Sequence, residues 1–341
     1  MAKSNPVGVF HRMGFRSWHV RSLLAGLIGA AALLMAPQEA QAQAWPSRPV
    51  SIIVPFPPGG NTDTMARLLA NTLGEKFGQS FFVENRVGAS GAIGTSAVAR
   101  SAPDGYTLMF GAVQQISVLP ITDKVNYDPK TDLSYISIFG EGPFVLGVNV
   151  DRVPSRTLPE FLEFVRQKRG AFSYASGGTN SISHLVAALM FDLAKSTVTH
   201  VPYRGGAPAV TDLMGGHIEA YFGNASELLT FASDPKIRIL AVSSESRMPQ
   251  LPNTPTVGEV FPGFSMTTWN GLMAPAKLPP EIFNKLAGAA QEAARDPLVV
   301  KTLNDLGITP VGGSPADFAK RISSEGPLLM DAIKAANAGA R

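Results

Sequence analysis

Short runs of β-branched and aromatic residues alternate with helical stretches along most of this chain of 341 residues. Residues 50–54 read as a buried strand, residues 61–77 carry apolar side chains at helical spacing, and Gly78 ends that helix. We place the helix cap at one of the first three polar residues, 61–63. This alternation predicts an α/β fold with a largely parallel sheet, because parallel neighbours are joined by helical crossovers.

The same rhythm recurs downstream, and the last part of the chain is mostly helical. Further strands are predicted at 81–83, 106–110, 144–150, 172–175, 198–201, 217–222 and 237–242, and further helices ending at Arg100 and over 158–168, 184–194, 207–214, 281–295, 298–306 and 316–336. The unit of strand, glycine-rich turn and helix appears near residue 55 and again near residue 176. This recurrence predicts two similar lobes with a ligand cleft between them.

The predicted lobes are discontinuous in sequence. We expect extended segments near 142–150 and 264–272 to cross between them, so that the C-terminal helices return to the first lobe. The predicted organisation is residues 1–44 as a signal peptide, 45–147 with 272–341 as the first lobe, and 148–271 as the second lobe.

The N-terminus is typical of a secretory signal peptide. Basic residues between Lys3 and Arg21 precede an apolar run from Leu23 to Ala36, and small residues follow at 40–44. This run is shorter than the ~20 residues needed to cross a bilayer, which argues against a transmembrane anchor. We therefore predict export to the periplasm, with cleavage near residues 42–44. The absence of an Arg–Arg pair favours the general secretory route.

Composition excludes several classes of function. The leader carries four of the 29 basic residues and one of the 26 acidic ones, so 25 of each remain and no basic patch supports nucleic-acid binding. The chain has no cysteine, which excludes disulfides and thiolate chemistry. Only His184, His200 and His217 lie beyond the leader, and no two have metal-ligand spacing. We expect no metal and no cofactor.

Three glycine-rich or polar loops stand where strands end and helices begin. They are Pro55–Asp63, Gly88–Gly94 and Ser176–Ser181. Free N–H groups at the start of each helix can bind an anion, although a simple tight connection is an equally good interpretation of the first loop. The glycines of the second loop have the wrong spacing for a dinucleotide site.

Catalytic patterns are weak in this sequence. Ser90 lies in Gly88–Ala92, which lacks the final glycine of a Gly-x-Ser-x-Gly elbow. A hydrolase would have to draw its base from three histidines that the sequence cannot pair with Ser90. No paired carboxylates suit general acid–base chemistry. We therefore expect a binding protein and not an enzyme, with a secreted serine-dependent hydrolase as the distant alternative.

Nine stretches, in order along residues 55–275, make the chain similar to the substrate-binding receptors of tripartite tricarboxylate transporters, the Bug family. The matching stretches are Pro55–Gly60 with Asp63, Asn85–Gly91, Pro103–Leu108, Tyr127–Pro129, Tyr174–Leu185, His200–Gly205, Leu213–Gly216, Pro255–Glu259 and Trp269–Pro275. The resemblance implies a two-lobed periplasmic binding fold that closes over its ligand. It also implies a carboxylate held in the first lobe by backbone amides and bridging waters.

The resemblance also carries over a set of ligand contacts by position. From the first lobe these are Phe56, Gly59, Asn61, Thr62, Asp63, Ala89 and Ser90, and from the second lobe Gly178, Thr179, Asn180, Ser181, His184 and Tyr203. For His184, a local hydrogen bond is the more frequent role of a histidine in such a place. Gln114 and Gln115 follow a predicted strand and either contact the ligand or cap the strand.

Two positions depart from the family pattern. Asn180 stands where the family usually has glycine, and we expect it to adopt the left-handed conformation that glycine would serve. Gly223–Asn224 stands where the family commonly has Asp–Asn. The missing carboxylate at 223 argues against a ligand with an amino group and leaves room for a neutral or anionic end. Whether Asn224 lines the pocket is open.

Together these features predict a monomeric periplasmic receptor that captures a small organic acid by hinged closure of its lobes. The predicted partners are the membrane subunits of a tripartite tricarboxylate-type transporter. A sensor kinase is the alternative partner within the same fold.

Overall fold

The computed structural model describes Gly8 and residues 45–339. The predicted signal peptide, residues 1–44, lies outside the described residues apart from Gly8. The chain from Pro46 onward forms one compact unit. None of the helices in this described part is long and apolar enough to cross a membrane.

Ten strands form two mixed sheets that share the long strand β4. Their order is β2-β1-β3-β9-β4-β7-β5-β6, and β8 and β10 also pair with β4. The strands are β1 (Val50–Val54), β2 (Phe81–Asn85), β3 (Thr107–Ala112), β4 (Leu133–Asn149), β5 (Ser173–Ser176), β6 (Thr199–Pro202), β7 (Ala220–Asn224), β8 (Ile237–Val242), β9 (Thr267–Pro275) and β10 (Thr309–Pro310).

Helices and helical turns connect and cover these strands. They are α2 (Asn61–Phe77), η1 (Ala89–Gly91), α3 (Ala92–Ala99), the π-helix η2 (Gln114–Val118), α4 (Leu119–Thr122), α5 (Leu158–Gln167), α6 (Ile182–Leu193), α7 (Gly206–Met214), α8 (Ala225–Leu228), η3 (Leu229–Phe231), η4 (Val257–Glu259), α9 (Pro280–Ala293), α10 (Pro297–Asp305) and α11 (Pro315–Gly339).

The predicted α/β class and most predicted elements are confirmed. The strand at 50–54 and the strand at 237–242 agree with β1 and β8, and Gly78 ends α2 in the left-handed conformation. The predicted cap at 61–63 is wrong. Gly60 is the N-cap, with extended backbone and no capping side chain, so the polar residues 61–63 form the first turn of α2.

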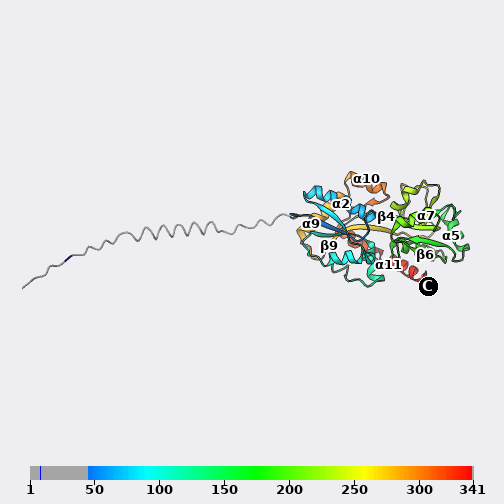
Figure 1. Cartoon of the computed structure of the whole chain (residues 1–341), viewed down its shortest axis with the longest axis horizontal. Coiled ribbons are helices and arrows are strands. Elements are labelled where there is room, and N and C mark those ends of the chain that lie inside the picture. Colours follow the sequence, from blue (N-terminus) through cyan, green and yellow to red (C-terminus); the bar gives the residue numbers. More distant parts are fainter. Residues whose placement is uncertain (1–7, 9–44, 340–341) are drawn as a thin grey trace, which may run out of the picture. The chain divides into compact units, whose positions relative to one another are not determined.

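Parallel pairs join β1 with β2 and β3, and β5 with β6 and β7, as strand–helix–strand units require. The antiparallel pairs all involve β4 or β9. Figure 1 shows β4 running between the group of β9, α2 and α9 and the group of β6, α5 and α7. Each sheet is therefore a parallel unit completed by antiparallel strands.

Strand β4 changes partners along its length. Leu133–Pro143 pairs with β9, and Phe144–Asn149 pairs with β7 and β8. Strand β9 lies between β3 and β4, and its residues Asn270–Met273 pair with β3. The lobe boundaries between residues 147 and 148 and between residues 271 and 272 remain predictions.

The C-terminal helix α11 packs against α6, β4 and the π-helix η2. Glu325 accepts hydrogen bonds from Ser117 Oγ (2.7 Å) and Trp269 Nε1 (2.8 Å). Arg321 pairs with Glu141 of β4 at 3.1 Å. Burial raises the pKa of Glu325, and the hydrogen bonds from these neighbours offset that effect only in part. Helix α11 thus fixes the position of the π-helix through the bond between Ser117 and Glu325.

Candidate ligand-binding site

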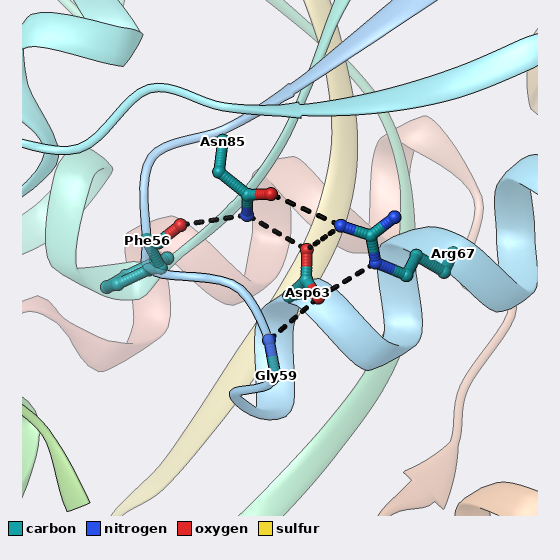
Figure 2. Close-up of polar contacts among 5 residues, drawn as sticks. All are labelled: Phe56, Gly59, Asp63, Arg67 and Asn85. Carbon is teal, nitrogen blue, oxygen red and sulfur yellow. Dashed lines mark hydrogen bonds and ion pairs between the residues drawn. The ribbon is translucent and has the colours of Figure 1, made fainter.

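The loop between β1 and α2 is organised around the carboxylate of Asp63. Oδ2 accepts hydrogen bonds from Gly59 N (2.9 Å) and Arg67 Nε (2.9 Å). Oδ1 accepts from Arg67 (3.0 Å) and from Asn85 Nδ2 (2.9 Å), and Asn85 Nδ2 also donates to Phe56 O (3.0 Å). Figure 2 shows that one carboxylate and one amide hold the loop at both of its ends.

Asp63 is only 3% exposed, whereas the Arg67 side chain is half-exposed. Burial raises the pKa of Asp63, but the hydrogen bonds from Arg67, Gly59 and Asn85 outweigh burial and lower the pKa below its ordinary value. Both carboxylate oxygens are occupied by these donors. Thr64 N, bonded to Gly60 O, is the first amide of α2 that makes a helical hydrogen bond. The amides before it are not used by the helix, so the loop can offer them to a ligand.

Below this helix start, Thr62 Oγ1 lies 2.7 Å from Asn270 Oδ1 of β9. Asn270 is 1% exposed, and its Nδ2 has no hydrogen-bond partner among the described residues. The neighbouring Asn61 Oδ1 is also buried and has no partner in that part of the chain. Buried polar atoms of this kind are uncommon, and they mark a place where water or ligand completes the hydrogen bonding.

The second glycine-rich loop has an unusual backbone. Ala89, Ser90 and Gly91 have φ values of 46°, 54° and 98°, so three consecutive residues are left-handed. Gln115 supports this turn: its Nε2 donates to Ser90 O (3.2 Å), and its Oε1 accepts from Ala112 N (3.2 Å). A Cβ on Gly91 would lie 2.4 Å from Gln115 Nε2, so glycine is required there. The exposed Ala89 and Ser90 are thereby held in a strained conformation that is typical of functional loops.

The third loop follows β5 and ends at the start of α6. Asn180 has a φ of 57°, which confirms the predicted left-handed conformation. Ser181 caps α6 by accepting a hydrogen bond from His184 N (3.3 Å), and its Oγ donates to Gly178 O (2.7 Å). Gly177 N donates to Ser183 Oγ (2.8 Å). Serine side chains thus hold the loop, and Thr179 at its tip is exposed.

His184 and His200 stack under this loop, with ring centroids 3.8 Å apart and an interplanar angle of 12°. His184 Nδ1 accepts a hydrogen bond from Asn180 N (3.1 Å), and His200 Nε2 lies 2.6 Å from Ser176 Oγ. Burial, with the charge of His200, lowers the pKa of His184 to about 3, and burial lowers the pKa of His200 to about 4. Both rings are therefore neutral at pH 7, and His184 makes a local hydrogen bond.

This stack predicts acid sensitivity. An unfolded histidine takes up a proton near pH 6.5, whereas the native rings resist protonation down to pH of about 4 and about 3. The unfolded state therefore binds more protons below pH 6.5, and stability should fall as the pH falls from 6.5 to 4. Urea unfolding across this range should show the decline, and His200→Gln should reduce its slope.

The exposed His217 provides the control for the acid prediction. The slope should be smaller in His200→Gln than in His217→Gln, which replaces a histidine outside the stack. Equal slopes for His200→Gln and the unchanged protein would contradict the role given to the stacked rings.

The end of β7 explains the departure at Gly223. A Cβ at this position would lie 2.1 Å from the Tyr221 ring, so the ring occupies the space of any larger residue. Tyr221 OH donates to Glu227 (2.6 Å), and Asn224 N and Nδ2 also donate to that carboxyl group (3.0 Å each). Burial raises the pKa of Glu227 more than these bonds lower it. Asn224 therefore caps α8 here.

Tyr203 extends the strand-end region next to the third loop. Its N–H donates to Ser176 O (3.0 Å), and its hydroxyl donates to Asp212 (2.7 Å). Burial and the bond to Asp212 raise the pKa of Tyr203 to about 12. The hydroxyl is thus committed to α7, and the backbone of Tyr203 adjoins the loop.

The predicted contacts fall into two groups, which Gln114 and Gln115 connect. Phe56–Asp63 and Ala89–Ser90 follow β1 and β2, and Gly178–His184 with Tyr203 follow β5 and β6. Gln114 Nε2 donates to Asn180 O (3.0 Å), so η2 touches the third loop directly. Asn85 and Asn270 were missing from the predicted contacts, and Gln114 was left open between a ligand contact and a cap of the strand. The polar pair after a predicted strand was the available signal for Gln114.

The chain matches one known protein family over most of its length. Residues 65–337 match the family described as "Tripartite tricarboxylate transporter family receptor". The chain belongs to this family. It is 35% identical over 306 residues to BugT of Bordetella pertussis, covering 88% of this chain and 92% of BugT.

Solved structures of similar proteins support the same family and fold. A structure titled "R. palustris Rpa4515 with adipate" is 32% identical with a TM-score of 0.81, covering 86% of this chain and 98% of that one. MatC of Rhodopseudomonas palustris with bound malate is 30% identical with a TM-score of 0.77, covering 85% and 100%. The family resemblance and the periplasmic binding-protein fold predicted from the sequence are confirmed. A receptor of this family is a solute-binding protein and not an enzyme.

Proposed function

We propose that this receptor captures a small carboxylate-bearing molecule in the periplasm, by closure of its two predicted lobes, and delivers it to the membrane subunits of a tripartite tricarboxylate-type transporter. The observation that carries the proposal is the loop around Asp63. In this loop Arg67 neutralises the Asp63 carboxylate, and Asp63 holds the loop so that the backbone amides at the start of α2 are available. This arrangement suits a ligand carboxylate.

Other features support the same conclusion. Two more loops end at helix starts. Among the described residues, buried side-chain atoms of Asn61, Asn270 and Gln114 have no hydrogen-bond partner and could bond a ligand or water. Relatives with 30% and 32% identity have bound malate and adipate, which are both carboxylates. The leader-like N-terminus predicts export, which would bring the receptor to its ligand.

The proposal predicts selective binding of acids over their amides. We would titrate the protein purified from the periplasm with mono-, di- and tricarboxylates and with the matched amides, by calorimetry and by the fluorescence of buried Trp269. At least one acid should bind stoichiometrically and at least about tenfold more tightly than its amide, because charge-assisted hydrogen bonds are roughly twice as strong as neutral ones.

Two outcomes would contradict this function. Amides that bind as tightly as the acids would exclude an anion site. Turnover of a ligand that is lost in Ser90→Ala would instead indicate the hydrolase. As a control, Ser323→Ala at an exposed position of α11 should change neither binding nor stability measurably.

A further inference from the structure

Gln114 is the first residue of the five-residue π-helix η2, and only Val113 separates it from the end of β3. Its side chain is 6% exposed, and its Nε2 donates to the backbone oxygen of Asn180 at 3.0 Å. Gln115 meanwhile holds Ser90 O on the opposite group of predicted contacts. Gln114 therefore lies where the two groups of loops meet. Such π-helical turns are frequent at functional sites.

The orientation of the Gln114 amide is fixed by its partner. A carbonyl oxygen can only accept a hydrogen bond, so the nitrogen of the amide must face Asn180 O. The oxygen, Oε1, consequently points elsewhere. It is buried and has no hydrogen-bond donor within the described part of the chain. Because a buried carbonyl oxygen without a donor is unfavourable, Oε1 needs a donor from beyond the described residues, such as a water or a ligand.

We propose that Gln114 Oε1 accepts a hydrogen bond from the ligand, so that the receptor selects hydroxy acids over the acids that lack the hydroxyl. This inference rests on the proposed function and names the class of its ligand. An acceptor alone does not distinguish a hydroxyl from an ammonium group, but the two carboxylates in the helices that follow β1 and β7 do. Asp63 is occupied by Arg67, and Glu227 is enclosed by Tyr221 and Asn224.

An ammonium group buried beside neutral acceptors would lack the carboxylate it needs, whereas a hydroxyl needs only one acceptor. Gly223 also argues against a ligand with an ammonium group, because the Tyr221 ring fills the space where the family commonly has a carboxylate. The arrangement therefore suits a carboxylate that carries a hydroxyl group.

The test uses matched pairs of acids that differ by one hydroxyl: malate and succinate, lactate and propionate, 3-hydroxyadipate and adipate. Calorimetry on the purified protein should show that the hydroxy acid of at least one pair binds about tenfold or more tightly than its partner. Gln114→Met keeps the length of the side chain and removes the acceptor. It should bring the two acids of that pair to within about twofold of each other.

Gln114→Glu provides an independent result. Its carboxylate cannot donate to Asn180 O and repels an anionic ligand, so it should weaken binding of both acids at least tenfold. Gln167→Met, on the exposed face of α5, removes a comparable amide far from these loops and should keep the preference for the hydroxyl. Thermal unfolding without ligand establishes that each variant is folded. Should Gln114→Met fail to fold, Gln114→Asn withdraws the same amide by one methylene and should reduce the preference.

Three results would overturn the inference. The two acids of every pair could bind equally well to the unchanged protein. The preference could persist in Gln114→Met, with both acids weakened alike, in which case Gln114 would only position the loop or hold a water. If none of the acids binds the unchanged protein, the proposed function itself is wrong and this inference fails with it.

Discussion

Asp63→Asn should lose most of the affinity for acids and about 2–4 kcal/mol of unfolding free energy. Each oxygen of Asp63 accepts two hydrogen bonds, one from Arg67 and one from either Gly59 or Asn85. Whichever oxygen becomes an NH2 group in the variant would then face two donors. The loop that presents the α2 amides should loosen, and the affinity should fall at least about tenfold.

Urea unfolding and calorimetric titration measure the two effects separately. Asp305→Asn is the matched control, because Asp305 forms an i,i+4 pair with Lys301 in which both side chains are exposed. That control should change stability by no more than about 1 kcal/mol and leave affinity unchanged. If Asp63→Asn behaves like the control, the Asp63–Arg67 pair does not organise the loop.

Gly223→Asp, which restores the residue common in the family, should destabilise the protein by about 2–4 kcal/mol and should not create an amino-acid receptor. The new Cβ would lie 2.1 Å from the ring of Tyr221, which is 1% exposed and tied to Glu227. The ring cannot move without breaking its hydrogen bond to the partly buried Glu227 carboxyl group. Thermal and urea unfolding measure the loss.

Gly288→Ala also replaces a glycine, but we expect it to stabilise the protein. Gly288 lies inside α9, and a Cβ there would meet nothing within 4 Å. It should therefore stabilise the protein by about 0.5–1 kcal/mol, since alanine favours the helix. A Gly223→Asp protein as stable as the original would show that Tyr221 can vacate the position.

Local patterns were enough to predict the parallel units. The apolar spacing of α2, the serine and threonine caps and the glycine at residue 78 act within a few residues of one another, so they are visible in the sequence. Ser314 and Asp317 form a capping group of the same local kind at the start of α11, with Asp317 N donating to Ser314 Oγ at 3.2 Å. The left-handed Asn180 was likewise predicted from residue type and position.

Strands β4 and β9 were harder to predict. Gly140, Gly142 and Pro143 resemble a turn, yet they lie inside β4 because long-range pairing overrides local preference. A Cβ on Gly140 would lie 3.1 Å from Ile308 and 3.3 Å from Met65, so the glycine accommodates packing that only the fold reveals.

Prediction of the site from the sequence was limited in the same way. The motifs identified the three loops, but they did not show what fixes them. Thr62 and Asn270 are 208 residues apart in sequence, and Gln114 and Asn180 are 66 apart. Nothing local in the sequence links residues at such separations. The Asp63–Arg67 pair, four residues apart on one helix, was visible as a spacing, but its role in holding Gly59 was not.

The position of β9 between β3 and β4 has a consequence for how the protein reaches its native state. The two strands it joins are complete by residue 149, but they cannot meet through β9 until residues 267–275 have been synthesised. Helix α11 then packs on α6, which was made more than a hundred residues earlier. Contacts of such large sequence separation slow folding. A chain with this strand order stays incompletely folded until its last quarter is available, which suits the export of an unfolded chain that the N-terminal sequence predicts.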